Sequence, residues 1–117
     1  MRAALVCAAI ILAVAGTPAF AAKKGAGRGV GTGTCAQFGQ LYKSDPKNID
    51  LIYTSWAQGF MSGWNFSTLP SYRDLGASTA ESQMMRIRNY CDEHPLVPFV
   101  KAVLEVYLSL PELQNSN

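Results

Sequence analysis

Cysteine and histidine are the residue types in this chain best suited to redox, nucleophilic or metal chemistry. The 117 residues include three cysteines, Cys7, Cys35 and Cys91, and a single histidine, His94. Cys7 lies in an apolar amino-terminal segment that we expect to be removed, which leaves an even pair. An even pair in a small exported chain predicts a disulfide, so we expect Cys35 and Cys91 to be bonded to each other and not to act as nucleophiles.

Because His94 is the single histidine, any Ser-His-Asp or Cys-His catalytic set in this chain would have to include it. It stands in Glu93-His94-Pro95, at the expected start of a helix, which is typical of a capping or surface histidine. Asp92, Glu93 and His94 are consecutive, so they cannot converge on one metal ion without partners from a second cluster, and the sequence has none. We therefore predict no catalytic residues, no metal, no cofactor and no enzymatic activity.

Five aromatic side chains in one predicted helix and just beyond it form the candidate surface for binding a protein partner: Tyr53, Trp56, Phe60, Trp64 and Phe66. Their helical spacing is typical of core packing. The alternative is that part of this surface is shielded at rest and binds a partner when the domain partly opens. We expect Trp64 and Phe66 to be its exposed members.

Gly59 and Gly63 lie four residues apart in the same predicted helix. A glycine in a helix interior costs about 1 kcal/mol relative to alanine. Close approach of another helix would offset this cost, so both glycines are predicted to be helix-packing positions.

The amino terminus has the pattern of a Sec-type signal peptide over residues 1–21. A positive start at Met1-Arg2 precedes an apolar stretch from Ala3 to Ala15 and the small-residue site Ala19-Phe20-Ala21. A membrane anchor is the alternative, but a spanning helix needs about 20 apolar residues and this stretch is shorter. We expect cleavage after Ala21, a periplasmic location (or secretion), and no stable membrane insertion afterwards.

The remaining chain supports one small domain of nearly balanced charge. Ten basic residues less Arg2 leave nine against eight acidic ones, so the net charge is 9 − 8 = +1, which does not favour a nucleic-acid partner. Residues 22–33 are rich in glycine and are predicted to be a flexible tail, although a basic glycine tract can also contact nucleic acid or anionic lipid. Residues 34–112 form the predicted domain, and residues 113–117 are expected to fray.

Helix signals divide that domain into four segments. The first helix is expected from the N-cap Thr34 to Asp45, and the second from Asn48 or Asp50 to about Asn65. A loop over residues 67–76 carries Leu69 and Tyr72 and should pack over the core. The S-x-x-E capping box of residues 78–81 opens the third helix, which ends near residues 91–92, and the fourth runs from residues 94–95 to Pro111. With no strand or hairpin signal, the prediction is an all-α fold, a small four-helix bundle stapled by one disulfide.

Three stretches resemble the HdeA/HdeB acid-stress chaperones of the bacterial periplasm. These are Cys35-Ala-Gln-Phe38, the run Trp-Ala-Gln-Gly-Phe-Met-Ser-Gly-Trp-Asn over residues 56–65, and Cys91 followed by Phe99 and Val103. The resemblance implies the family's Cys35–Cys91 disulfide and its small helical bundle. It further implies a homodimer near neutral pH that opens in acid and holds acid-unfolded periplasmic proteins in solution.

A second resemblance concerns residues 90–111, which are similar to the carboxy-terminal part of periplasmic immunity proteins of the Tai type. The similarity lies in His94-Pro95, Ala102-Val103 and Leu110-Pro111. It implies tight binding to a cell-wall amidase toxin delivered by type VI secretion, through an exposed loop such as residues 67–76. An envelope protein with the same fold and another binding task is the third alternative.

Overall fold

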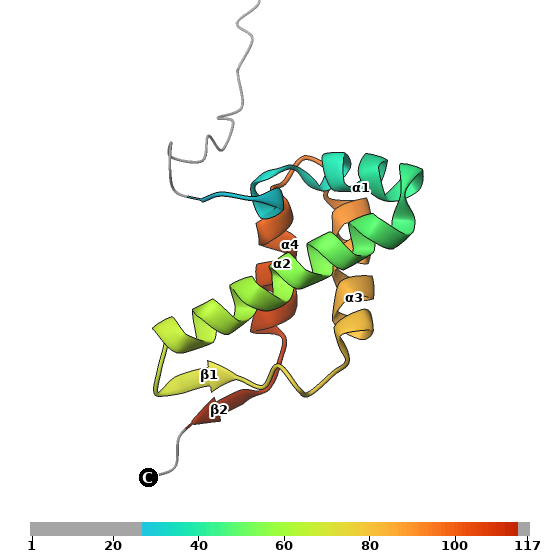
Figure 1. Ribbon diagram of the computed structural model, residues 1–117. Helices are drawn as coiled ribbons and strands as arrows, with labels where there is room; N and C mark the ends of the chain where they lie inside the picture. The colour runs from blue at the N-terminus through green and yellow to red at the C-terminus, as the bar shows by residue number, and fades with distance from the viewer. Residues whose placement is uncertain (1–26, 115–117) are drawn as a thin grey trace, which may run out of the picture.

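The computed structural model describes residues 27–114 (Figure 1). Its main elements are four α-helices, preceded by a short 3-10 helix, η1, and accompanied by two strands: η1 (Val30–Thr32), α1 (Cys35–Ser44), α2 (Pro46–Ser67), β1 (Ser71–Arg73), α3 (Ala80–Glu93), α4 (Phe99–Leu108) and β2 (Glu112–Gln114). The predicted all-α class with four helices is confirmed. The predicted signal peptide, with Cys7, lies outside the described residues.

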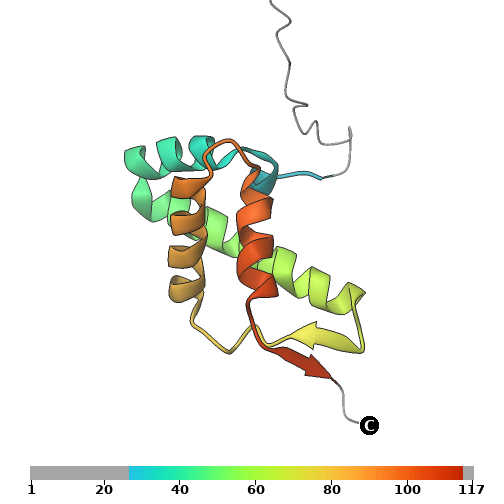
Figure 2. The same ribbon diagram turned by 180° about the vertical axis from the view of Figure 1, so that it is seen from behind.

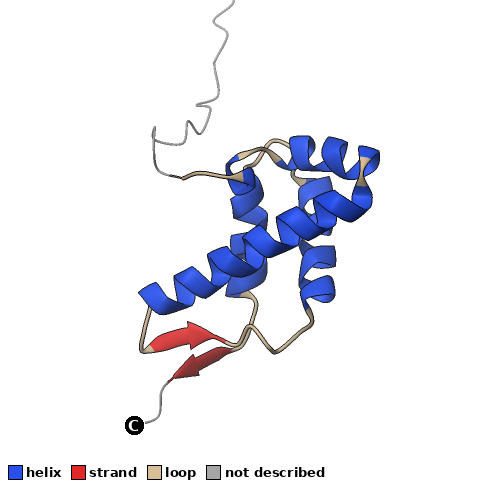
Figure 3. Cartoon of the chain, in the orientation of Figure 1, coloured by secondary structure: helices blue, strands red, loops and turns tan. Residues whose placement is uncertain are grey.

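The helices form one core with the small sheet at its edge. α3 and α4 run antiparallel and side by side, and α2 crosses both of them diagonally (Figures 1 and 2). α1 packs at one end of this arrangement, and the two strands lie at the opposite end (Figure 3). The core joins residues from all four helices: Cys35, Phe38, Tyr53, Ala57, Met61, Met84, Ile87, Cys91, Phe99, Ala102, Val103, Val106 and Tyr107.

The starts of α1 and α2 follow from their caps. The Thr34 hydroxyl accepts a hydrogen bond from the Gln37 backbone N–H, and the Gln37 side chain accepts one from the Thr34 N–H, which completes a capping box. α2 begins at Pro46, with Asp45 as its N-cap. The predicted start at Asn48 or Asp50 is therefore wrong by up to about one turn, because proline is well suited to the first helical position.

The predicted starts of α3 and α4 also need correction. Thr79 caps α3 by accepting from the Ser82 N–H, so the cap is one residue later than the predicted Ser78. α4 begins at Phe99 and not at residues 94–95. The turn between α3 and α4 binds the start of α1 instead of forming helix. The carbonyls of Pro95 and Val97 accept hydrogen bonds of 2.8 Å from the first two N–H groups of α1.

The predicted disulfide is present between Cys35, at the start of α1, and Cys91, in the last turn of α3. Both cysteines are buried in the core. The bond closes a loop with a sequence separation of 56 residues. It therefore fixes α1 on α3 at the same place where the turn after α3 binds the backbone of α1.

The two-stranded sheet is a feature that the sequence did not predict. β1 and β2 are antiparallel, with Tyr72 opposite Leu113, and the Asp74 N–H continues the pairing to the Pro111 carbonyl at 2.8 Å. The expectation that residues 113–117 fray is thus wrong for residues 113 and 114, and residues 115–117 lie outside the described part. Three-residue strands are too short to show an alternating pattern, so only their long-range pairing reveals them.

The end of the glycine-rich segment is also ordered on the domain, contrary to the predicted flexible tail over residues 22–33. Gly31 is buried, and a side chain there would overlap the indole of Trp56. The Gly33 carbonyl accepts a hydrogen bond from the Phe99 N–H at 2.7 Å. Glycine is required at position 31 because only a residue without Cβ lets the backbone lie against the indole ring of Trp56.

Candidate functional site

The five predicted aromatic side chains separate into three environments. Tyr53 is in the core, Trp56 and Phe60 are partly buried, and Trp64 and Phe66 are exposed at the carboxy-terminal end of α2. Trp56 stacks on Phe60 with ring centroids 5.3 Å apart, and the ring centroids of Phe60 and Trp64 are 5.7 Å apart. Core packing therefore accounts for the first part of the row, and the last two members present apolar surface to solvent.

The glycine-rich segment shields one side of this aromatic row. Besides Gly31, Gly29 lies against the Trp56 indole, with a φ of 89°, a left-handed backbone conformation that glycine adopts without strain. The segment of residues 29–33 thus covers Trp56 and leaves Trp64 and Phe66 uncovered.

Gly59 and Gly63 do not have the predicted role within the chain. Both are exposed on α2, and a Cβ added at either position would meet nothing within 4 Å. No helix of the described part approaches them, so the prediction of a close helix contact inside the domain is wrong. The reason is geometric, because α2 turns Tyr53, Ala57 and Met61 toward the core and the glycines lie on the opposite side.

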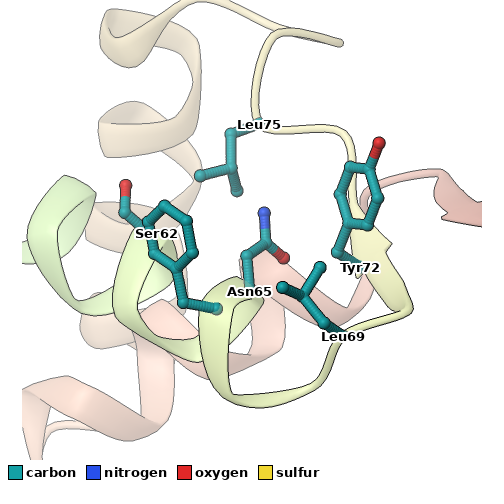
Figure 4. A pocket seen from close by; sticks show the side chains of 6 residues that line it. Ser62, Asn65, Leu69, Tyr72 and Leu75 are labelled. Carbon is teal, nitrogen blue, oxygen red and sulfur yellow. The ribbon is translucent and has the colours of Figure 1, made fainter. Parts of the chain in front are cut away.

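A pocket opens between the end of α2 and the β1 region (Figure 4). Its volume is about 370 Å³, within the range of small-ligand and side-chain pockets. The lining residues come from α2, from the turn after it and from the segment around β1: Ser62, Asn65, Phe66, Leu69, Tyr72 and Leu75. Of these, sequence reasoning singled out Phe66 as a site residue, and it placed Leu69 and Tyr72 in a loop over the core.

Asn65 holds the pocket together. Its side-chain oxygen accepts hydrogen bonds from the Arg73 N–H at 2.9 Å and from the Tyr107 hydroxyl at 2.7 Å, and its amide donates to the Arg73 carbonyl at 2.9 Å. The amide therefore acts as a strand partner for β1 and joins α2, β1 and α4. Sequence reasoning missed this role, and the only local sign is an asparagine, a poor helix former, near the end of a helix.

The pocket walls carry no charge. Between Asp50 and Arg73 the chain has no Asp, Glu, Lys, Arg or His. The polar groups near the pocket floor are engaged, because the Ser62 hydroxyl donates to the Gln58 carbonyl at 2.8 Å and Asn65 is bonded as described. The surface left for a ligand is thus mainly apolar, with one face open to solvent.

Other polar clusters of the described residues are structural. Gln83 is 1% exposed, donates to the carbonyls of Leu75 and Ser78, and accepts from the Gln58 side chain at 2.7 Å. Arg88 pairs with Asp50 at 3.0 Å and hydrogen bonds to the Tyr42 hydroxyl. These contacts tie α3 to the loop before it, to α1 and to α2.

His94 is exposed and stacks on Tyr90 with ring centroids 4.1 Å apart, and its Nδ1 lies 3.0 Å from the Tyr90 carbonyl oxygen. It is the C-cap residue of α3. Within residues 27–114, no group of three or more His, Cys, Asp and Glu side chains could hold a metal ion. No helix in that range is both long enough and apolar enough to cross a membrane.

Two pKa values are displaced by their surroundings. Burial in the core raises the pKa of Tyr53, since the neutral phenol is favoured where water is excluded. The hydrogen bond from Lys101 to Glu105, one turn along α4, raises the pKa of the lysine. Neither group lines the pocket.

The fold and the pocket define a small all-α, disulfide-bonded domain with an uncharged apolar surface at one end. Comparison of the chain with protein-family models, with curated proteins and with solved structures finds no match. The family resemblances drawn from the sequence therefore stay predictions.

Proposed function

We propose that the chain is a non-enzymatic binding protein of the bacterial periplasm that binds another protein through the pocket between the end of α2 and the β1 region. The observation that carries this proposal is Phe66, which is 77% exposed beside an open, uncharged pocket. Exposed aromatic side chains next to a pocket are common anchors of protein interfaces. The loop of residues 67–76, expected to bind a toxin if the chain is an immunity protein, contributes one wall.

The chemistry of the pocket favours an apolar side chain of the partner. A charged group would lose water there and find no ionic partner among the lining residues, which is unfavourable. The Asn65 hydrogen bonds hold α2 and β1 in place before binding. A preformed pocket loses little conformational entropy on binding, so the apolar contact contributes more fully to affinity.

The test places a photo-crosslinking amino acid at Phe66 or Leu69 in the producing cell at neutral pH. Leu96, which is 86% exposed in the turn between α3 and α4, is the matched control position. We expect one discrete crosslinked protein from residues 66 and 69 and none from residue 96. Once that partner is purified, Phe66→Asp should weaken its affinity at least about ten-fold, and Leu96→Asp should leave it unchanged. Crosslinking that is equal at all three positions, or that fails at residues 66 and 69, contradicts the proposal.

A second candidate function, the acid-activated chaperone, is supported by the shielded part of the aromatic row. The segment of residues 29–33 covers Trp56, so its release would join Trp56 and Phe60 to the surface already exposed at Trp64. Such an enlarged apolar patch suits the binding of many unfolded clients.

Acid would act on this domain through its surface charges. Each of the eight carboxylates is exposed or half-buried, and three of them form ion pairs: Arg73–Glu112, Arg88–Asp50 and Lys101–Glu105. Protonation below about pH 4 removes these pairs and leaves only positive charges, which repel one another.

A turbidity assay with an acid-denatured client separates the two functions. Suppression of aggregation that appears only at about pH 2–3, together with increased dye-accessible apolar surface, supports the chaperone. A protein that stays compact in acid without suppressing aggregation, and that still captures one partner at neutral pH, supports the specific binding protein.

A further inference from the structure

The outer edge of the two-stranded sheet is a feature that the proposed function leaves unused. β1 lies next to the end of α2, and β2 lies on the far side of β1 (Figures 1 and 3). All three residues of β2 are exposed. A sheet edge without a neighbouring strand presents backbone N–H and C=O groups that are free to bind another chain.

The pairing of the strands shows which backbone groups of β2 point outward. In an antiparallel pair, residues that bond to the other strand alternate with residues whose N–H and C=O point away from it. Arg73 points away from β2, because its N–H and its C=O both bond to the side chain of Asn65. Glu112 stands opposite Arg73, and Gln114 stands opposite Ser71, two positions along. The backbone groups of Glu112 and Gln114 therefore point away from β1.

Asn65 closes the edge of the sheet toward α2, whereas nothing in the described part of the chain closes the other edge. There, the N–H and C=O groups of Glu112 and Gln114 have no hydrogen-bond partner among the described residues. Pro111 does not block this edge. Its carbonyl accepts from the Asp74 N–H, so the side on which it lacks an N–H is the side of β1.

The four free groups favour an extended peptide segment as their occupant. A helix has already used its own backbone groups, and an apolar surface has none to offer. A strand presents alternating N–H and C=O groups with the same rise of about 3.3 Å per residue, so it can bond to all four. The edge thus specifies the backbone conformation of its occupant, which the apolar pocket does not.

The side chains of the sheet connect this edge to the pocket. Tyr72 lines the pocket, and Leu113, which is 39% exposed, stands opposite Tyr72 on the same face of the sheet. On the other face, a side-chain oxygen of Glu112 lies 3.7 Å from a guanidinium nitrogen of Arg73, so this charge already has a partner. A strand added to β2 would place one of its side chains beside Leu113, where an apolar group is favoured.

The pocket and the edge are close enough to belong to one interface. Neighbouring strands are about 4.8 Å apart, so an added strand would lie about 10 Å from β1 and the pocket beside it. A standard interface of roughly 800 Å² on each protein is wider than this. The row from the pocket through Tyr72 to Leu113 is continuous, which favours the protein bound at the pocket as the one that supplies the strand.

We propose that the protein bound at the pocket also adds an extended segment to the outer edge of β2, which completes a three-stranded sheet. This inference rests on the proposed function, because it assigns a second contact to the same bound protein. It also gives that protein a chemical signature. The segment is exposed and extended, and an apolar residue that packs on Leu113 stands between two polar ones.

The test changes one backbone group and controls for the side chain. Gln114→Pro removes the outward N–H of residue 114, whereas Gln114→Ala removes the side chain and keeps that N–H. The bound protein is the one that crosslinks at residue 66. Gln114→Pro should raise its dissociation constant at least about ten-fold, and Gln114→Ala should leave it within about two-fold. In both variants the Asp74 N–H should stay protected from hydrogen exchange, which shows that β1 and β2 remain paired.

Hydrogen exchange in the unmodified complex tests the edge without any substitution. The N–H groups of Glu112 and Gln114 should exchange at least about ten-fold more slowly once the protein is bound, because they become hydrogen bonded. The N–H of Leu96, which is 86% exposed in the turn between α3 and α4, should exchange at an unchanged rate.

The outcomes separate this inference from the proposed function. If no protein crosslinks at residues 66 and 69, both fail. If a protein binds there but leaves the N–H groups of Glu112 and Gln114 unprotected, or binds Gln114→Pro as tightly as the unmodified chain, the strand contact alone is overturned. A dimer of the purified chain that Gln114→Pro abolishes would assign the edge to a second copy, which also overturns the strand contact.

Discussion

Asn65 is the residue whose replacement the structure predicts most sharply. Its half-buried side chain makes three hydrogen bonds of 2.7–2.9 Å, two to the backbone of Arg73 and one with the Tyr107 hydroxyl. Asn65→Ala leaves all three partner groups unpaired. At about 1 kcal/mol for each net hydrogen bond, the loss in free energy of unfolding is about 3 kcal/mol. For a domain of this size, that corresponds to a melting temperature lower by about 12–24 °C.

The assay is urea and thermal unfolding of three variants. Tyr107→Phe removes one of the three bonds and should cost about 1 kcal/mol. The double variant Asn65→Ala with Tyr107→Phe should cost no more than Asn65→Ala alone, because the hydroxyl has already lost its partner. Asn89→Ala, an exposed asparagine on α3, is the control and should stay within about 0.5 kcal/mol. A loss under about 1 kcal/mol for Asn65→Ala, or strictly additive costs, would refute the role assigned to Asn65.

Three further predictions concern the remaining parts of the fold. Reducing the Cys35–Cys91 bond should lower the free energy of unfolding by up to about 4 kcal/mol, as expected for the loop that it closes, and denaturant titration with and without reductant measures this. Gly31→Val should displace the glycine-rich segment from Trp56 and change the tryptophan emission; unchanged emission would mean that the segment does not cover the indole. Because the pKa of Tyr53 is raised in the folded state, its contribution to stability is complete below about pH 10 and is lost as the pH rises toward the folded pKa. Tyr53→Phe should therefore flatten the alkaline fall in urea-unfolding free energy, and an unaltered slope between about pH 9 and 11 would contradict this account.

The sequence determined the features that rest on local chemistry and on counting. Thr34 can cap a helix whatever surrounds it, so the first helix could be placed to within a residue or so. The second helix was predicted to open at Asn48 or Asp50, and it begins within about a turn of that, at Pro46. Once Cys7 is assigned to the signal peptide, two cysteines allow only one pairing, and that pairing is present. The uncharged run between Asp50 and Arg73 is likewise visible without coordinates.

Tertiary structure decided the features that depend on residues far apart in the chain. Asn65 acquires its role only because the fold brings Arg73 and Tyr107 within hydrogen-bonding distance of it. Likewise, β1 and β2 form only because residue 71 comes to lie opposite residue 114. Gly31 has a defined conformation because the Trp56 indole lies against it. Gly59 looks like a packing position from the sequence, but periodicity gives the spacing of a face and not what covers it. The direction of each helix face is fixed by the whole core, and here the core places Gly59 and Phe66 in solvent.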